Sequence, residues 1–213
     1  MGSRRQTGKQ VSAPAFVPYF GHYKSPRTNP RPEAALLDLR AVYELLTGPT
    51  LREPTARLQA APAGSPAAQT AENTLPALTG AGVFSPHRAD ENLIRFSRCL
   101  LLEFNTVPDV AAARAALLAD PVLAPALLLV FGSPRGTGLR VLLAAFPSGS
   151  GWPTLHQSDL TPTQASRVLA ENFLGWAIWI QERHGLRARA HGRTLPNACP
   201  LGYDPAAWLA SGY

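Results

Sequence analysis

The sequence predicts an α+β fold with a mixed sheet flanked by helices. Two observations lead to this prediction: short apolar runs bounded by turn residues, which are typical of buried strands, and longer segments whose apolar residues recur at helical spacing. The chain has 213 residues, of which 46% are hydrophobic and 16% charged, enough for one globular domain with a sizeable core. Wholesale disorder is therefore excluded.

The chain begins with a basic arm. Residues 1–32 hold six Lys and Arg side chains and no acid, so the whole net charge of +6 sits in this segment. Such an arm either attracts phosphates or remains a solvated tail, and we expect one short strand in it, around residues 16–20. We divide the chain into this arm and a single domain over residues 33–213.

Helices are predicted over residues 33–46, 109–119 and 161–184. The first has leucines at helical spacing and stops at Gly48. The last opens with a capping box, in which Thr161 stands three residues before Gln164. Residues 53–74 are rich in Ala, Pro, Ser and Thr, and we expect them to form a flexible insertion.

Strands are predicted over residues 97–104, 126–132 and 139–146. A helix joins the first two strands, which is typical of a crossover between parallel strands. A six-residue loop, Ser133 to Gly138, joins the last two and suits a hairpin. We therefore expect parallel and antiparallel pairings in one sheet.

Several protein classes are excluded by what the sequence lacks. No apolar run approaches the roughly 20 residues that span a bilayer, so we expect a cytoplasmic protein without membrane contact. The two cysteines, Cys99 and Cys199, have no metal-ligand spacing and indicate no disulfide framework. Walker-type, G-x-S-x-G and H-E-x-x-H motifs are missing, so hydrolase and NTPase functions lack support.

Motifs occur in a recognisable order between residues 75 and 205. They are LPALTGAGVF at 75–84, Arg88, NLI at 92–94, Ser97, LLLEFN at 100–105, SPRGTGLR at 133–140 and GYDP at 202–205. Together they resemble the N-terminal domain of virulence-associated protein E-like proteins of bacterial mobile elements. That family is similar to archaeo-eukaryotic primases and primase-polymerases, which implies an RRM-like core with a two-metal nucleotidyl-transfer site.

The resemblance puts the catalytic site at the end of the first predicted strand. Glu103 and Asn105 project to the same side, where the family has an Asp-x-Asp pair that holds metal. Asn105 removes a carboxylate, so Mg²⁺ or Mn²⁺ would be left with Glu103, and we predict weakened or absent polymerase chemistry. The alternative for Glu103 is a strand-end acid that pairs with an arginine. In the alternative of an active enzyme, a second carboxylate would share the ions, and Asp90 and Asp204 are candidates for it. Asp204 also suits a turn cap.

A second set of residues is predicted to bind phosphate. The loop glycines let the backbone turn tightly and aim N–H groups at an anion, while the arginines supply positive charge. The alternative is a hairpin with a solvated arginine. The predicted residues are Ser133, Arg135, Gly136, Gly138, Arg140, Arg88, Arg187 and Arg189.

The resemblance, taken with these residues, implies a primase-polymerase-like module that binds single-stranded or primer-template DNA during mobile-element replication and is catalytically degenerate. One alternative is an active metal-dependent primase or nucleotidyltransferase. Another is a non-enzymatic scaffold for a helicase or recombinase, whose DNA affinity would be flat with salt or absent. The residues leave open whether the ligand is DNA, RNA or a nucleotide.

Overall fold

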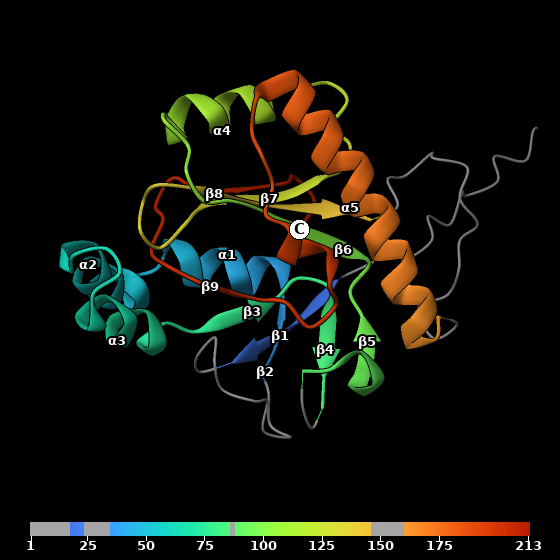
Figure 1. The fold of residues 1–213 in the computed structure, drawn as a ribbon, viewed down its shortest axis with the longest axis horizontal. Helices are drawn as coiled ribbons and strands as arrows, with labels where there is room; N and C mark the ends of the chain where they lie inside the picture. Colours follow the sequence, from blue (N-terminus) through green and yellow to red (C-terminus); the bar gives the residue numbers. More distant parts are fainter. Residues whose placement is uncertain (1–17, 24–34, 86–87, 146–159) are drawn as a thin grey trace, which may run out of the picture.

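The computed structural model describes residues 18–23, 35–85, 88–145 and 160–213 (Figure 1). The helices are α1 Leu39–Thr47, α2 Arg52–Ala60, α3 Pro66–Thr74, α4 Val110–Leu118 and α5 Pro162–His184. The strands are β1 Tyr19–Tyr23, β2 Ala35–Asp38, β3 Ala77–Thr79, β4 Gly82–Phe84, β5 Leu93–Phe96, β6 Cys99–Phe104, β7 Leu127–Gly132, β8 Leu139–Ala144, β9 Ala198–Pro200 and β10 Trp208–Leu209. Short 3-10 turns lie at Pro49–Leu51, Asp90–Asn92 and Ala190–Arg193. This mixture of helices and sheets confirms the α+β class.

The strands form a main sheet of order β10-β7-β8-β6, a second sheet of order β2-β1-β3-β9, and the hairpin β4-β5. Every strand pair among the described residues is antiparallel, so the expected mixture of pairings is wrong. The crossover from β6 through α4 does lead to a strand of the same direction, β7. However, β8 inserts between β6 and β7 and is antiparallel to both.

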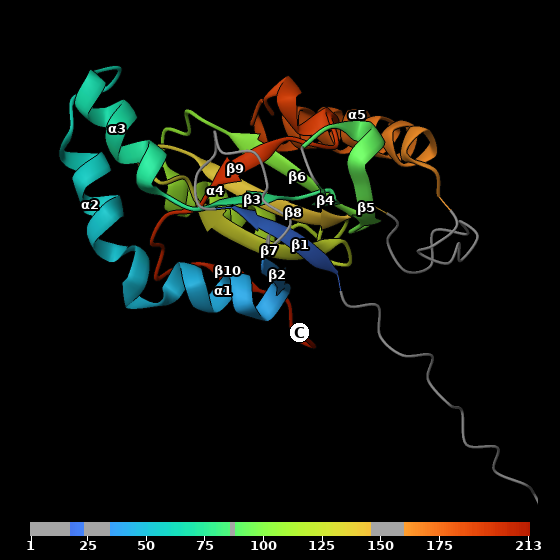
Figure 2. The ribbon, with the colours of Figure 1, turned by 90° about the horizontal axis from the view of Figure 1, so that it is seen from below.

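The main sheet is covered on both faces. Helices α4 and α5 lie on one face, and α1 lies with the second sheet on the other, as Figure 2 shows most directly. Side chains of β6 alternate between the two cores: Leu100 and Leu102 pack toward α5, whereas Cys99 and Leu101 pack toward α1 and the second sheet. Glu103 lies on the same side of β6 as Cys99 and Leu101, and Arg140 is its direct partner on β8. Both side chains therefore lie between the two sheets.

The second sheet corrects two expectations about the N-terminal third. Strand β1 lies inside the predicted arm, yet it pairs with β2 and β3 and buries Phe20 completely, so the folded domain begins before residue 33. The six basic residues of the arm lie outside the described residues. The helix predicted from residue 33 starts at Leu39 instead, because Asp38 ends β2 and caps α1 by accepting a hydrogen bond from the Ala41 N–H at 2.8 Å.

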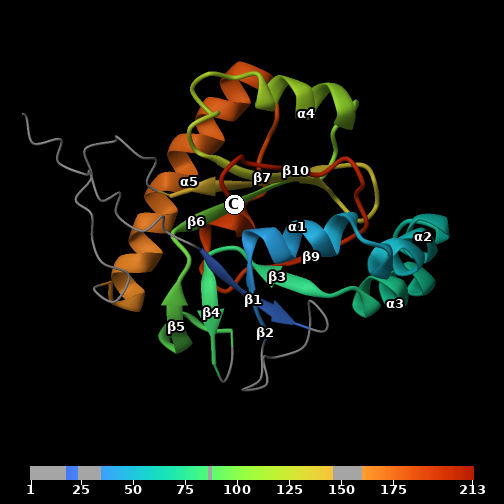
Figure 3. The same ribbon diagram turned by 180° about the vertical axis from the view of Figure 1, so that it is seen from behind.

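Residues 53–74 form most of a helical hairpin, α2 and α3, in place of the expected flexible insertion. Ser65 caps α3 by accepting from the Ala68 N–H, and Pro66 occupies the first helical turn. Leu58, Ala68 and Leu75 form a small apolar cluster of their own, separate from the two larger cores. Figures 2 and 3 show the hairpin projecting beyond one end of the sheets.

The remaining predicted elements are confirmed. Strands β6, β7 and β8 and helices α4 and α5 lie within two residues of the expected bounds. The capping box at Thr161 and Gln164 is formed, and α5 ends at Gly185, whose φ of 67° is left-handed. In the described part of the chain, no helix combines the length and apolar character needed to cross a membrane.

Candidate functional site

The loop between β7 and β8 is shaped by two of its glycines. Gly136 has a φ of 77°, which favours glycine, and Gly138 is packed so closely that a Cβ would collide with the carbonyl oxygens of Phe104 and Asn105. The loop is closed by hydrogen bonds from the Ser133 N–H to the Gly138 carbonyl and from the Gly136 N–H to the Ser133 carbonyl, both at 2.8 Å. These two N–H groups are therefore engaged within the loop, and the glycines set its shape.

Glu103 forms a buried ion pair with Arg140. The two residues are directly opposite each other on β6 and β8, and Glu103 Oε2 lies 3.1 Å from Arg140 Nε. Only 5% of the Glu103 side chain and 6% of the Arg140 side chain is exposed. The structure thus bears out the alternative in which Glu103 is a strand-end acid that pairs with an arginine.

The second oxygen of Glu103 is occupied as well. The Asn197 amide donates to Glu103 Oε1 at 3.0 Å, and the Arg140 Nε also lies 3.3 Å from the Cys199 sulfur. Burial raises the pKa of the Cys199 thiol to about 12, against a smaller lowering effect of the neighbouring Arg140. The Arg140 guanidinium is therefore held by the Glu103 carboxylate and contacts a neutral thiol.

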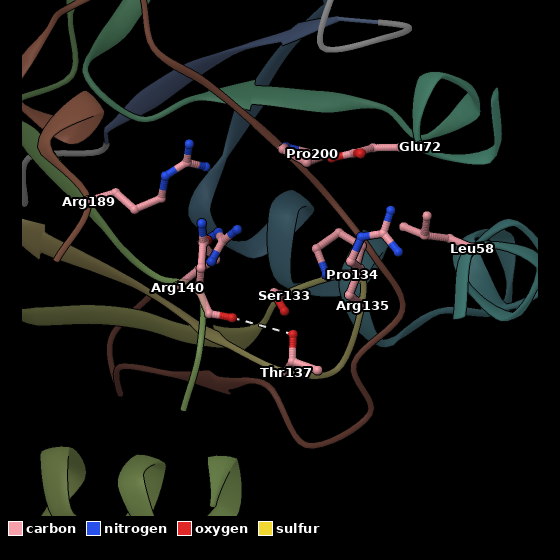
Figure 4. Close-up of a pocket in the computed structure, with 10 residues that line it drawn as sticks. Leu58, Glu72, Ser133, Pro134, Arg135, Thr137, Arg140, Arg189 and Pro200 are labelled. Carbon is pink, nitrogen blue, oxygen red and sulfur yellow. Dashed lines mark hydrogen bonds between the residues drawn. The ribbon is translucent and has the colours of Figure 1, made fainter. Parts of the chain in front are cut away.

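Arg140, but not Glu103, lines a cavity of about 180 Å³. Arg140 and Arg189 enter it from one side and Arg135 from the other, while Glu72 extends from α3 toward Pro200 (Figure 4). Among the described residues, the guanidinium groups of Arg135 and Arg189 have no hydrogen-bond acceptor and no ion-pair partner. The full lining is Leu58, Glu72, Asn105, Ser133, Pro134, Arg135, Thr137, Arg140, Arg189 and Pro200.

Two segments hold the walls of the cavity in place. The Gln59 amide of α2 donates to the Pro134 carbonyl at 3.0 Å, which ties the helical hairpin to the β7–β8 loop. On the other side, the Arg189 N–H donates to the Glu103 carbonyl at 2.9 Å, which anchors the segment after α5 along β6. Ser133 adds a buried hydroxyl oxygen with no hydrogen-bond partner in the described residues.

The structure brings together four of the eight predicted phosphate-binding residues, namely Ser133, Arg135, Arg140 and Arg189, with Asn105 beside them. Gly136 and Gly138 shape the loop without lining the cavity. Arg88 lies elsewhere, with its guanidinium carbon 5.4 Å from the centre of the Tyr23 ring, and Arg187 is exposed outside the lining.

The two carboxylates considered as further metal ligands have structural partners elsewhere. Asp90 accepts from the Ser166 hydroxyl at 3.1 Å, and Asp204 pairs with Arg114 at 2.6 Å while also capping the turn at Ala206. No group of three His, Cys, Asp or Glu side chains among the described residues could hold a metal ion. The donors present at Glu103 do not fit a two-metal centre, because its single carboxylate is already bound by Arg140 and Asn197.

Several motif residues that carry the resemblance have structural roles. The Ser97 hydroxyl donates to the Gly80 carbonyl at 2.6 Å and accepts from the Cys99 N–H, and a Cβ at Gly80 would collide with Leu101. Gly202 packs equally closely on Pro134, which joins the GYDP motif to the β7–β8 loop. These motif residues therefore stabilise the strands and the β7–β8 loop and do not line the cavity themselves.

Sequence reasoning missed Glu72 and Leu58, which line the cavity from the helical hairpin. Both lie in the segment predicted to be flexible. The available signal was Ser65 followed by Pro66, a typical helix start. That signal would have placed a helix there without indicating which of its side chains faces the arginines.

The fold and the site define an α+β domain with an arginine-lined cavity at the end of its main sheet. A model of the family described as "BT4734-like, N-terminal domain" matches residues 70–208, and the chain belongs to this family. The match includes every residue of the cavity lining except Leu58. Neither the curated proteins nor the solved structures that we searched contain a significant match.

Proposed function

We propose that this domain is a primase-polymerase-like module that binds single-stranded DNA without catalysing nucleotidyl transfer, in the service of mobile-element replication. The observation that carries the proposal is the convergence of Arg135, Arg140 and Arg189 on one cavity. Guanidinium groups bind phosphate through several N–H donors at once. Two of these three groups have no acceptor within the described protein and are therefore available to a ligand.

The order of elements supports the primase-like part of the proposal. β6, α4, β7, β8 and α5 follow one another along the chain, with β8 between β6 and β7. An RRM-like or ferredoxin-like core begins with the same sequence of elements. In such a core a last strand would run beside β6, and here the segment around Arg189 occupies that edge through a single backbone hydrogen bond.

The state of Glu103 supports the loss of catalysis. Two-metal chemistry needs several carboxylates whose oxygens are free to bind the ions. Glu103 accepts from Arg140 and Asn197, and the second residue of the expected Asp-x-Asp pair, just beyond the end of β6, is the neutral Asn105. We therefore derive no nucleotidyl-transfer step for this site.

The proposal is tested by measuring the affinity for a fluorescently labelled oligothymidine at several salt concentrations. Each phosphate that the protein neutralises on a single strand adds about 0.7 to the slope of log affinity against log salt. Arg135→Ala and Arg189→Ala should each weaken binding and lower that slope by about 0.7. Arg167→Ala is the matched control, because Arg167 is an exposed arginine of α5 that pairs with Glu171.

Templated nucleotide incorporation in Mg²⁺ and Mn²⁺ is measured in the same samples. We expect none. Incorporation by the wild-type protein that disappears in Glu103→Gln would establish the active primase instead. Equal slopes for the wild type and both cavity variants would exclude this cavity as the DNA site.

One observation favours the alternative function, a scaffold for protein partners. Helix α5 exposes Leu174 and Ile178, with 56% and 55% of their surfaces accessible, one turn apart on its outer face. Exposed apolar side chains grouped in this way are typical of protein contacts. DNA affinity that is absent or independent of salt would favour this function over the proposed one.

A further inference from the structure

One carboxylate lines the otherwise basic cavity. Glu72 extends into it from α3, and its half-buried side chain forms no hydrogen bond or ion pair with any residue that the structure describes (Figure 4). An acid that stands beside arginines without pairing with them lowers the positive potential that the cavity offers to an anion. Glu72 thus works against strong anion binding, in a site whose other charged side chains favour it.

The charges around the cavity leave a small positive excess. The guanidinium groups of Arg135, Arg140 and Arg189 face the carboxylates of Glu72 and of Glu103, the partner of Arg140. Three positive and two negative groups leave one net positive charge. An internal phosphodiester carries one negative charge, whereas a phosphate monoester carries about −1.5 to −2 at pH 7 and a triphosphate carries more.

The size and openness of the cavity agree with this charge. Its volume of about 180 Å³ is smaller than the roughly 300–1,000 Å³ of sites that enclose a drug-sized ligand, so it suits one phosphate and part of a sugar. Asn105 and Thr137 on its lining are exposed. A strand can therefore continue out of the cavity beyond the phosphate that it holds.

We propose that the cavity selects an internal phosphodiester of a nucleic-acid strand over free nucleotides and terminal phosphates, and that Glu72 sets this selectivity. The inference rests on the proposed function, because it names which part of the nucleic acid the same site binds. Glu72 repels the additional charge of a terminal phosphate or a triphosphate. Arg135 and Arg189 supply the donors for the single charge of the phosphodiester.

The test is displacement of a base-labelled oligothymidine with hydroxyl groups at both ends. The competitors are the same unlabelled oligothymidine, thymidine 5′-monophosphate and thymidine 5′-triphosphate, all in EDTA so that no metal neutralises their charge. The proteins are the wild type, Glu72→Gln, and Glu171→Gln. The last removes the same charge from α5, outside the cavity.

We expect the wild type to release the label to unlabelled oligothymidine, and to require an at least tenfold higher concentration of the triphosphate. Removing one charge within the cavity changes the binding of a more highly charged ligand by about tenfold. Glu72→Gln should therefore improve competition by the triphosphate about tenfold relative to the oligothymidine. Glu171→Gln should leave this ratio unchanged.

The outcomes separate the two proposals. If the labelled oligothymidine does not bind the wild type at all, the proposed function fails, and the selectivity fails with it. If the oligothymidine binds but the triphosphate displaces it at equal or lower concentration, only the selectivity is overturned. The same conclusion follows if Glu72→Gln and Glu171→Gln give the same competition ratio.

Discussion

Replacing Glu103 separates a structural carboxylate from a metal-binding one. Glu103 Oε2 and Arg140 Nε are 3.1 Å apart, and about 95% of each side chain is out of solvent. At that distance the attraction is about 5 kcal/mol for an effective dielectric constant of 20. Removing one member of a buried ion pair costs about 3–5 kcal/mol, because the other charge stays buried without compensation. We therefore expect Glu103→Ala to lower the free energy of unfolding by about 3–5 kcal/mol.

The assay is thermal and urea unfolding of the wild type, Glu103→Ala, Arg140→Met and the double variant Glu103→Leu, Arg140→Met. For a chain of this size, 1 kcal/mol corresponds to roughly 2–4 °C, so Glu103→Ala should lower the Tm by about 10 °C. The double variant should lose less than the sum of the single variants, because it leaves no unpaired charge.

A metal-binding role for Glu103 predicts the opposite behaviour. Acids gathered to hold Mg²⁺ repel one another without the ion, so removing one would be neutral or stabilising. Added Mg²⁺ would then raise the Tm of the wild type and not that of Glu103→Ala. A loss below 1 kcal/mol, or such a Mg²⁺ effect, would refute our interpretation of the ion pair.

Two further predictions concern the loop and the end of α5. Gly138→Ala should destabilise the protein by about 3 kcal/mol in urea unfolding, since the new Cβ meets the Phe104 carbonyl, and an unchanged midpoint would contradict the tight packing. Burial alone would raise the pKa of the Asp120 carboxyl, but hydrogen bonds from His184 and two backbone N–H groups lower it overall. The resulting stability is present above the unfolded pKa of about 3.9 and is lost as the pH falls through the lower folded pKa. Unfolding measured between pH 2 and 6 should therefore show a smaller acid-induced loss for Asp120→Asn, and identical pH profiles would refute this.

The sequence predicted best those elements whose signals lie within a few neighbouring residues. The capping box of α5 and the apolar run of β6 are complete within a few residues, and both elements form where expected. The sequence predicts a short strand that overlaps β1 but assigns it to an arm outside the domain, because the neighbouring residues are polar and basic. Only its pairing with β2 and β3, far along the chain, makes it part of the core.

Only the part of the candidate site that one short segment encodes could be predicted from the sequence. Arg135 and Arg140 belong to one loop and its following strand, so their proximity follows from a single hairpin. The pairing of Glu103 with Arg140 depends on the register between β6 and β8, which no local pattern specifies. Glu72 reaches the cavity only through the docking of a helical hairpin whose composition predicted no stable structure.

The helical hairpin of α2 and α3 gives the cavity one wall of lower local stability than the rest of the domain. Its apolar cluster of Leu58, Ala68 and Leu75 is small and separate from the cores of the sheets. Side-chain hydrogen bonds from Gln59 to the Pro134 carbonyl and from the Tyr203 N–H to the Thr55 hydroxyl oxygen help to attach it. Segments with so few buried contacts open at a lower free energy than the whole domain unfolds. A bound strand would then leave when the hairpin opens, so that weakening either attachment would shorten the residence time of the ligand while the rate of encounter stays the same.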